Sequence, residues 1–136
     1  MKKYELTSET KRHGRTTLHR IKALRSFRDV KAGQLGGFVK SESNLSHDGN
    51  CWVYLNATAT DDSVVKDDAI ADDNAIILGF ATLKHQAIVT DNSMARGHAV
   101  SCGGSMVMGN ALVTGNGVVG GNAMIGGNDV VSGLKN

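Results

Sequence analysis

Two histidines, His85 and His98, are the residues of this sequence best suited to acid–base chemistry. An imidazole can take a proton from a substrate when it lies in a groove, so each is a weak candidate for a general base. Both stand where the chain is expected to turn a corner. The alternative, which we favour, is that histidine tolerates the tight turn there and is solvated.

Metal chemistry has less support. A zinc enzyme would need three histidine ligands, whereas His85 and His98 alone lie in the regular part of the chain. The others lie earlier: His13, His19 and His47. Three acidic pairs could hold calcium or form solvated edges that prevent pairing with another sheet: Asp61-Asp62, Asp67-Asp68 and Asp72-Asp73. We expect no metal site and no cofactor.

Charge divides the chain into a basic head and an acidic body. Residues 1–44 carry eleven Lys or Arg against four acids, and residues 45–136 carry four against nine. The head could bind nucleic acid, an acidic protein or the acidic body of a neighbouring copy. No known DNA-reading motif is present, and aromatic residues are few. The candidate binding residues are Lys11, Arg12, Arg15, Arg20, Lys22, Arg25 and Arg28.

These residues are organised by a repeat. Residues 57–134 divide without gaps into thirteen units of six. The first position is Ala, Ser or Gly in twelve units, and the third is Val, Ile or Leu in nine. The fifth is Gly in eight and Asp in four, and the sixth is often Asn. A fixed period of this kind predicts a stacked parallel β-helix.

The residue types fit that prediction. Side chains alternate between the faces of a strand, so the first and third positions share the inner face, one small and one branched. Gly, Asn and Asp at the last two positions tolerate the positive φ of a tight corner. Cys51 should point inward and Cys102 outward, so we expect reduced thiols in a cytoplasmic protein. No apolar run is long enough to cross a membrane.

Units such as residues 107–112 (VMGNAL) resemble the hexapeptide repeat of left-handed parallel β-helix proteins. The resemblance implies an all-β fold with left-handed coils, three units per coil. Residues 18 apart would then lie above one another, in a little more than four coils. We expect a β-helix over residues 45–136 and a small β-rich cap over residues 1–44, because the open end of a stack needs covering.

Within the cap, residues 3–6 are predicted to be a short strand and residues 16–24 a longer one. Leu18, Ile21 and Leu24 are also spaced as on a helix. The residues expected to cover the first coil are Tyr4, Leu18, Ile21, Phe27, Leu35 and Phe38.

The outward positions form three flat sides, two of them apolar. The first side presents Thr58, Ile76, Leu78, Met94, Leu112 and Val130. The second presents Ile70, Ile88, Met106, Met108 and Met124. The third presents Val64, Thr82, Val100 and Val118, beside Lys66, Lys84 and Cys102. Monomers rarely expose apolar areas of this extent, so we expect a homo-oligomer, a trimer by the resemblance or else a dimer.

One corner carries a column of amides: Asn74, Asn92, Asn110 and Asn128. Their side chains should hydrogen-bond to one another as a ladder, although a row that lines a ligand site is the functional alternative. Many hexapeptide β-helix trimers transfer acetyl groups from coenzyme A. Such enzymes often carry their histidine on a loop, and this repeat has no inserted loop.

A second resemblance covers residues 2 to about 57. Five segments in this range resemble the N-terminal head of phage and prophage β-helix proteins of unassigned function. They are KYELTSET, TLHRIKAL, DVKAGQLGGFV, NLS and GNCWVY. We therefore predict a non-enzymatic oligomer in the host cytoplasm. It would bind a host or phage macromolecule, or a small anionic ligand between subunits, and so counter host defence. An acyltransferase that uses acetyl-coenzyme A is the first alternative, and nucleic-acid binding through the basic head is the second.

Overall fold

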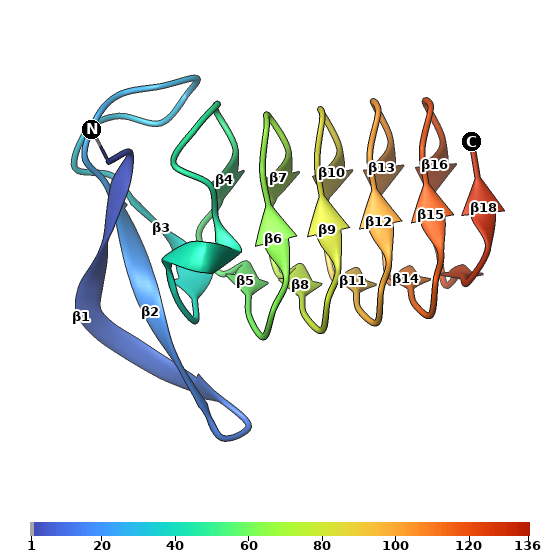
Figure 1. Ribbon diagram of the computed structural model, residues 1–136, viewed down its shortest axis with the longest axis horizontal. Coiled ribbons are helices and arrows are strands. Elements are labelled where there is room, and N and C mark those ends of the chain that lie inside the picture. The colour runs from blue at the N-terminus through green and yellow to red at the C-terminus, as the bar shows by residue number, and fades with distance from the viewer. Residues whose placement is uncertain (1) are drawn as a thin grey trace.

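The computed structural model describes residues 2–136 and is an all-β parallel solenoid of about five turns (Figure 1). Its arrangement is consistent with a left-handed β-helix. Three sheets form the sides of the stack. The first contains β1 (Tyr4–His13), β2 (Thr16–Ala23), β3 (Leu35–Val39), β5 (Thr58–Ala59), β8 (Ile76–Ile77), β11 (Met94–Ala95), β14 (Leu112–Val113) and β17 (Val130–Val131).

The other two sheets contain five strands each. The second side is formed by β4 (Trp52–Val53), β7 (Ile70–Ala71), β10 (Ile88–Val89), β13 (Met106–Val107) and β16 (Met124–Ile125). The third is formed by β6 (Val64–Val65), β9 (Thr82–Leu83), β12 (Val100–Ser101), β15 (Val118–Val119) and β18 (Leu134–Lys135). A 3-10 turn, η1 (Glu42–Asn44), precedes β4. Among the described residues, no helix has the length and apolarity to span a bilayer.

The predicted 18-residue stacking is confirmed. Met94 pairs with Ile76 and Leu112, and Ile88 pairs with Ile70 and Met106. The regular register ends at β17, because Leu134 pairs with Val118 instead of occupying a corner. The thirteenth unit is therefore irregular at its last position, where a corner residue was expected.

The interior is filled in alternating layers of large and small side chains. One coil contributes Ile77, Leu83 and Val89, all fully buried. The coils above and below contribute smaller sets: Ala59, Val65 and Ala71 on one side, Ala95, Ser101 and Val107 on the other. Large residues of one layer can thus occupy space left by the next, which keeps a narrow interior densely packed.

Ser101 is the polar exception among these inward third positions. Its hydroxyl is buried and has no hydrogen-bond partner within residues 2–136. A buried hydroxyl without a partner costs about 1–3 kcal/mol. We therefore expect Ser101→Ala to raise the free energy of unfolding by about 1 kcal/mol, measured by urea denaturation.

The matched control is Ser93→Ala. The Ser93 hydroxyl is also inside the stack, but it donates to the carbonyl oxygens of Thr90 and Val107. Removing it should lower the free energy of unfolding by about 1 kcal/mol. If both substitutions shift the free energy of unfolding in the same direction, the hydrogen-bond explanation is wrong.

The cap differs from the prediction in several places. The first strand runs to His13, far beyond residue 6, and its register against β2 shifts between Leu6 and Thr10. The second predicted strand is confirmed as β2, so the helical alternative is wrong. Leu35 is 44% exposed and does not cover the first coil, whereas the other predicted cap residues are buried. The parallel pairing of the stack reaches back to β3, which pairs with β5.

Hydrogen-bond direction explains much of the cap's composition. At strand starts and corners, backbone N–H groups of one coil donate to carbonyls of the next, as in Thr58 to Ala75 and Val64 to Ala81. Carbonyl groups at these places in the first coil have no preceding coil, so donors of the cap can satisfy them. The Lys3 ammonium donates to the Gly49 and Cys51 carbonyls, and the Tyr4 hydroxyl donates to that of Leu45.

Lys3 is fully buried, and its Nζ lies 3.3 Å from the Cys51 thiol and 5.1 Å from the Phe27 ring centroid. Burial lowers the pKa of the Lys3 amine and raises the pKa of the Cys51 thiol. Both cysteines are free thiols, Cys51 buried and Cys102 half-buried, as the sequence predicted. Lys3 therefore serves the cap as a buried donor.

Candidate ligand groove and corner residues

The corners of the stack are held by side chains at the fifth position of each unit. Asp61, Asp67 and Asp91 all adopt positive φ. Each carboxylate accepts the backbone N–H one coil further on, at 2.9–3.0 Å. These aspartates therefore satisfy corner donors that would otherwise face solvent. The structure gives a structural role to two of the three acidic pairs considered for calcium.

His85 occupies the same corner position and makes the same contact. Its φ is 58°, and its Nδ1 accepts the N–H of Gly103 at 3.0 Å. A backbone N–H is always a donor, so Nδ1 must be the acceptor. The neutral ring then carries its proton on Nε2, which leaves no free lone pair for a general base. In this conformation His85 replaces an aspartate as a corner acceptor.

His98 lies on a different corner from His85, so the structure does not bring the two histidines together. Its ring stacks on Phe80, which stands 18 residues earlier on the same corner. The ring centroids are 4.9 Å apart, the planes are within 6°, and Phe80 is 57% exposed. His98 is itself exposed and makes no side-chain hydrogen bond within residues 2–136.

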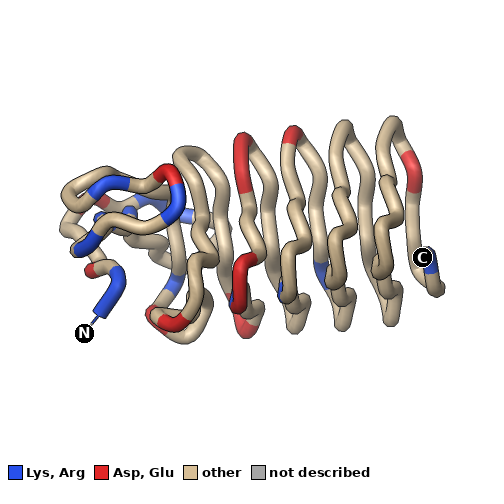
Figure 2. Tube along the Cα trace, turned by 90° about the horizontal axis from the view of Figure 1, so that it is seen from above, with Lys and Arg blue, Asp and Glu red and all other residues tan. Residues whose placement is uncertain are grey.

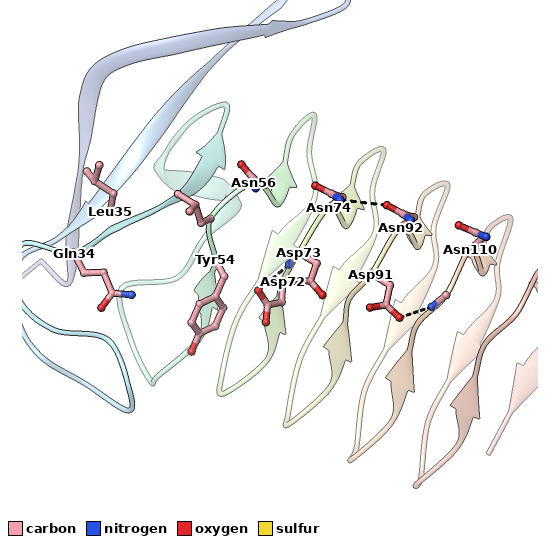
Figure 3. Close-up of a pocket in the computed structure, with 12 residues that line it drawn as sticks. Gln34, Leu35, Tyr54, Asn56, Asp72, Asp73, Asn74, Asp91, Asn92 and Asn110 are labelled. Carbon is pink, nitrogen blue, oxygen red and sulfur yellow. Dashed lines mark hydrogen bonds between the residues drawn. The ribbon is translucent and has the colours of Figure 1, made fainter.

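A groove runs along the third corner, between the cap and the coils (Figure 3). Its volume is about 930 Å³, within the usual range for ligand pockets. One end is formed by Gln34, Leu35 and Tyr54, and the corner itself contributes the floor. The floor residues are Leu55, Asn56, Asp72, Asp73, Asn74, Asp91, Asn92, Gly109 and Asn110.

The groove is acidic and rich in amides. Asn74 donates from its side chain to Asn92 Oδ1 at 3.3 Å, which confirms one rung of the predicted ladder. Figure 3 shows the amide groups in a row with Asp73 and Asp91 beside them. None of the three groove carboxylates forms an ion pair with a cation of the described chain. The row can therefore offer acceptors and negative charge to a bound molecule.

Tyr54 closes the groove as part of the cap contact. Its hydroxyl donates to Asp29 of the loop between β2 and β3. Burial, followed by the Asp29 carboxylate, raises the pKa of Tyr54 to about 12. The phenol therefore stays protonated and able to donate to Asp29 throughout the neutral range.

The predicted basic residues separate into two sets. Arg20 pairs with Glu9 at 2.8 Å and donates to the Gly36 carbonyl, and Arg28 donates to the Asp68 carbonyl. Arg25 lies over the Phe27 ring, and Lys22 is half-buried in β2. The remaining three belong to the exposed hairpin between β1 and β2: Lys11, Arg12 and Arg15.

The predicted apolar sides are arranged as the spacing required. Residues at the second position are mostly half-buried by their neighbours above and below, while Met124 and Val130 in the last coils are 67% and 65% exposed. The columns predicted to form an interface are Ile76, Leu78, Met94 and Leu112 on the first side, and Ile70, Ile88, Met106, Met108 and Met124 on the second.

Sequence reasoning missed the cap half of the groove. The amide column was visible at its 18-residue spacing, whereas Gln34, Leu35 and Tyr54 obey no repeat. It also missed the burial of Trp52, an outward position by the repeat, because a cap loop covers it. No group of three or more His, Cys, Asp or Glu suited to a metal occurs in residues 2–136.

No protein-family model matches the chain. Among curated proteins, the chain is similar to the uncharacterized acetyltransferase YdcK of Escherichia coli (strain K12). The two are 37% identical over an alignment of 76 residues, and the match covers 48% of this chain and 23% of YdcK. The chain thus matches less than a quarter of YdcK's length.

Proposed function

We propose that this chain is a non-enzymatic binding protein that works as a homo-oligomer and holds a partner in the amide-lined corner groove. The groove itself carries the proposal. Its volume, its row of acceptors and its carboxylates without an ion-pair partner in residues 2–136 suit a molecule with basic or hydrogen-bond-donating groups. Three carboxylates oppose a small anionic ligand at this place, so we favour a macromolecule that presents Lys or Arg.

The apolar columns of the first and second sides support the oligomer. Ile, Leu and Met on flat strands bury well against a second copy, and monomers rarely expose a contiguous apolar patch of more than a few hundred Å². A trimer follows the hexapeptide resemblance. Light scattering at micromolar concentration should give the mass of three chains, and a monomer would contradict the assembly.

The resemblance of the head to phage proteins suggests which class of partner the groove binds. A host or phage macromolecule is the partner class that the resemblance of residues 2–57 favours, and interference with host defence is the purpose we infer. The groove then recognises a basic segment of that partner.

A pair of variants tests the groove. Asp73→Asn with Asp91→Asn removes two groove charges while keeping an acceptor oxygen at each position. With an oligolysine peptide as probe in calorimetry, we expect this variant to bind at least about tenfold more weakly, a loss of about 1.4 kcal/mol.

The control removes the same charge elsewhere. The control variant carries Asp62→Asn and Asp67→Asn, which are on the other two corners. Asp67 accepts a hydrogen bond from a corner N–H, just as Asp91 does. This control should bind the peptide like the wild-type protein. Equal weakening in both variants would mean that overall charge, and not the groove, binds the peptide.

An acetyltransferase is the second candidate, because the chain is similar to part of YdcK. His98, which is exposed and makes no side-chain hydrogen bond within residues 2–136, is the residue that would take the proton. Acetyl-coenzyme A should then raise the melting temperature of the wild-type and His85→Ala proteins but not of His98→Ala. No stabilisation of any of the three would remove this candidate.

A further inference from the structure

The hairpin between β1 and β2 projects from the cap as a two-stranded ribbon with its tip clear of the coils (Figure 1). We call residues 8–17 the arm. Every residue from Ser8 to Arg15 is exposed, and the strands pair from Thr10–His19 to His13–Thr16. A two-stranded ribbon with no layer behind it is marginally stable by itself. Its length and exposure therefore call for a role outside the fold.

From Thr10 onward the arm belongs to a strongly basic stretch, and Glu9 at its start pairs with Arg20. Residues 10–28 contain seven Lys or Arg and no acid. Figure 2 shows most of the basic residues gathered at the cap end and several acidic ones on the first coils. Three of the seven cations lie on the arm itself: Lys11, Arg12 and Arg15.

The structure uses several head cations but leaves those of the arm without a carboxylate. Lys2 pairs with Glu42, Lys3 donates to coil carbonyls, and Arg20 pairs with Glu9. Within residues 2–136, none of the three arm cations forms an ion pair. The requirement for donors at the end of the stack therefore explains the buried cations and not the arm.

Lys11 is held beside another cation. Its Nζ and the Arg20 guanidinium both lie 4.4 Å from the Phe38 ring centroid. Burial and the nearby Arg20 charge lower the pKa of Lys11. Arg20 already pairs with Glu9, whereas Lys11 forms no ion pair within residues 2–136, so the Lys11 charge is open to a negatively charged partner.

We propose that the arm binds double-stranded DNA through its phosphate backbone, as a ribbon laid in the major groove. That groove is about 12 Å wide and admits a two-stranded β-ribbon, whereas the major groove of an RNA duplex is too narrow. Arm cations would neutralise phosphates, and Thr10 and Thr17 would donate hydroxyls to phosphate oxygens. These contacts fix position without reading sequence.

The acidic coils of a second copy fit the arm less well. The first regular coil carries its carboxylates as pairs on different corners: Asp61-Asp62, Asp67-Asp68 and Asp72-Asp73. An arm that crossed any one corner would meet only two neighbouring carboxylates. It would not meet an extended row of negative charge. Several of their oxygens also accept backbone N–H groups already. A phosphate backbone, in contrast, repeats its charge along the whole ribbon.

Fluorescence anisotropy with a short labelled DNA duplex tests the proposal. The arm variant replaces Lys11, Arg12 and Arg15 by Gln, and all three side chains are exposed, so the fold should be kept. The control replaces Lys66, Lys84 and Arg96 by Gln, which changes net charge equally on the sides of the stack. Circular dichroism melting confirms that both variants are folded.

We expect the arm variant to bind duplex at least about tenfold more weakly at about 50 mM salt, with the control unchanged. The slope of log affinity against log salt should fall by roughly 0.9 for each phosphate that the variant no longer neutralises. Equal weakening in the control, or no binding of wild-type protein to duplex, would overturn the proposal. So would tighter binding to single-stranded RNA or to polyglutamate than to duplex, which would assign the arm to another partner.

Discussion

Trp52→Ala is expected to lower the free energy of unfolding by about 3–5 kcal/mol, because it empties the contact between cap and stack. Trp52 is fully buried at an outward position of β4. Its ring meets Phe27 edge-on at 5.2 Å and Tyr4 at 6.1 Å between centroids. Removing the indole leaves a cavity lined by residues of the cap loop, of β1 and of the first coil, and these cannot all collapse into it.

Urea unfolding followed by circular dichroism measures this effect without relying on the lost tryptophan fluorescence. A loss of this size approaches the whole stability of a small domain, about 5–15 kcal/mol, so the cap should detach before the coils melt. Phe80→Ala is the control, since that ring is 57% exposed at a corner. A Trp52→Ala protein as stable as Phe80→Ala would show that the cap contributes little to the stack.

The repeat could be predicted because every coil obeys the same local rule. Small first and branched third positions must point inward, and 18-residue spacing then fixes which residues pair, as Ile88 does with Met106. Corner residues could be recognised for the same reason. His85 occupies the same corner position as Asp67 of the preceding coil. Its role as a hydrogen-bond acceptor could therefore be inferred from the repeat.

The cap could not be predicted to the same extent, because no period governs it. The burial of Trp52 depends on a loop that folds over the second side, and the extension of β1 to His13 depends on pairing with β2. The register shift after Leu6 is likewise a property of two strands together. The same holds for the groove. Its amide row could be predicted from the repeat, whereas the residues at its cap end could not.

The donors of the cap do follow from elementary chemistry. At strand starts and corners the N–H groups donate to the following coil, so the first coil presents carbonyls there. Lys, Arg and Tyr are then the side chains that can cover it, which accounts for the buried Lys3 and Tyr4. The excess of positive charge in the head thus has two origins, one structural and one, on the arm, that we assign to DNA.

Gly37→Ala is the second substitution with a large expected effect. An added methyl at Gly37 would overlap the carbonyl oxygens of Tyr54 and Ala57 and would lie 2.8 Å from Val53 Cγ1. Backbone oxygens cannot rotate away as a side chain can. The Ala57 carbonyl also accepts the N–H of Phe38, so separation would break the pairing of β3 with β5. We expect a loss of about 3 kcal/mol, at the upper end for overpacking.

Gly133→Ala is the matched control, since an added methyl there meets no atom within 4 Å and the backbone has no positive φ. Its free energy of unfolding should stay within about 0.5 kcal/mol of the wild-type value. Hydrogen exchange should show that Gly37→Ala first loses protection in β1, β2 and β3, because each coil contacts only its neighbours. Uniform loss of protection along the stack would instead mean that cap and coils unfold as one unit.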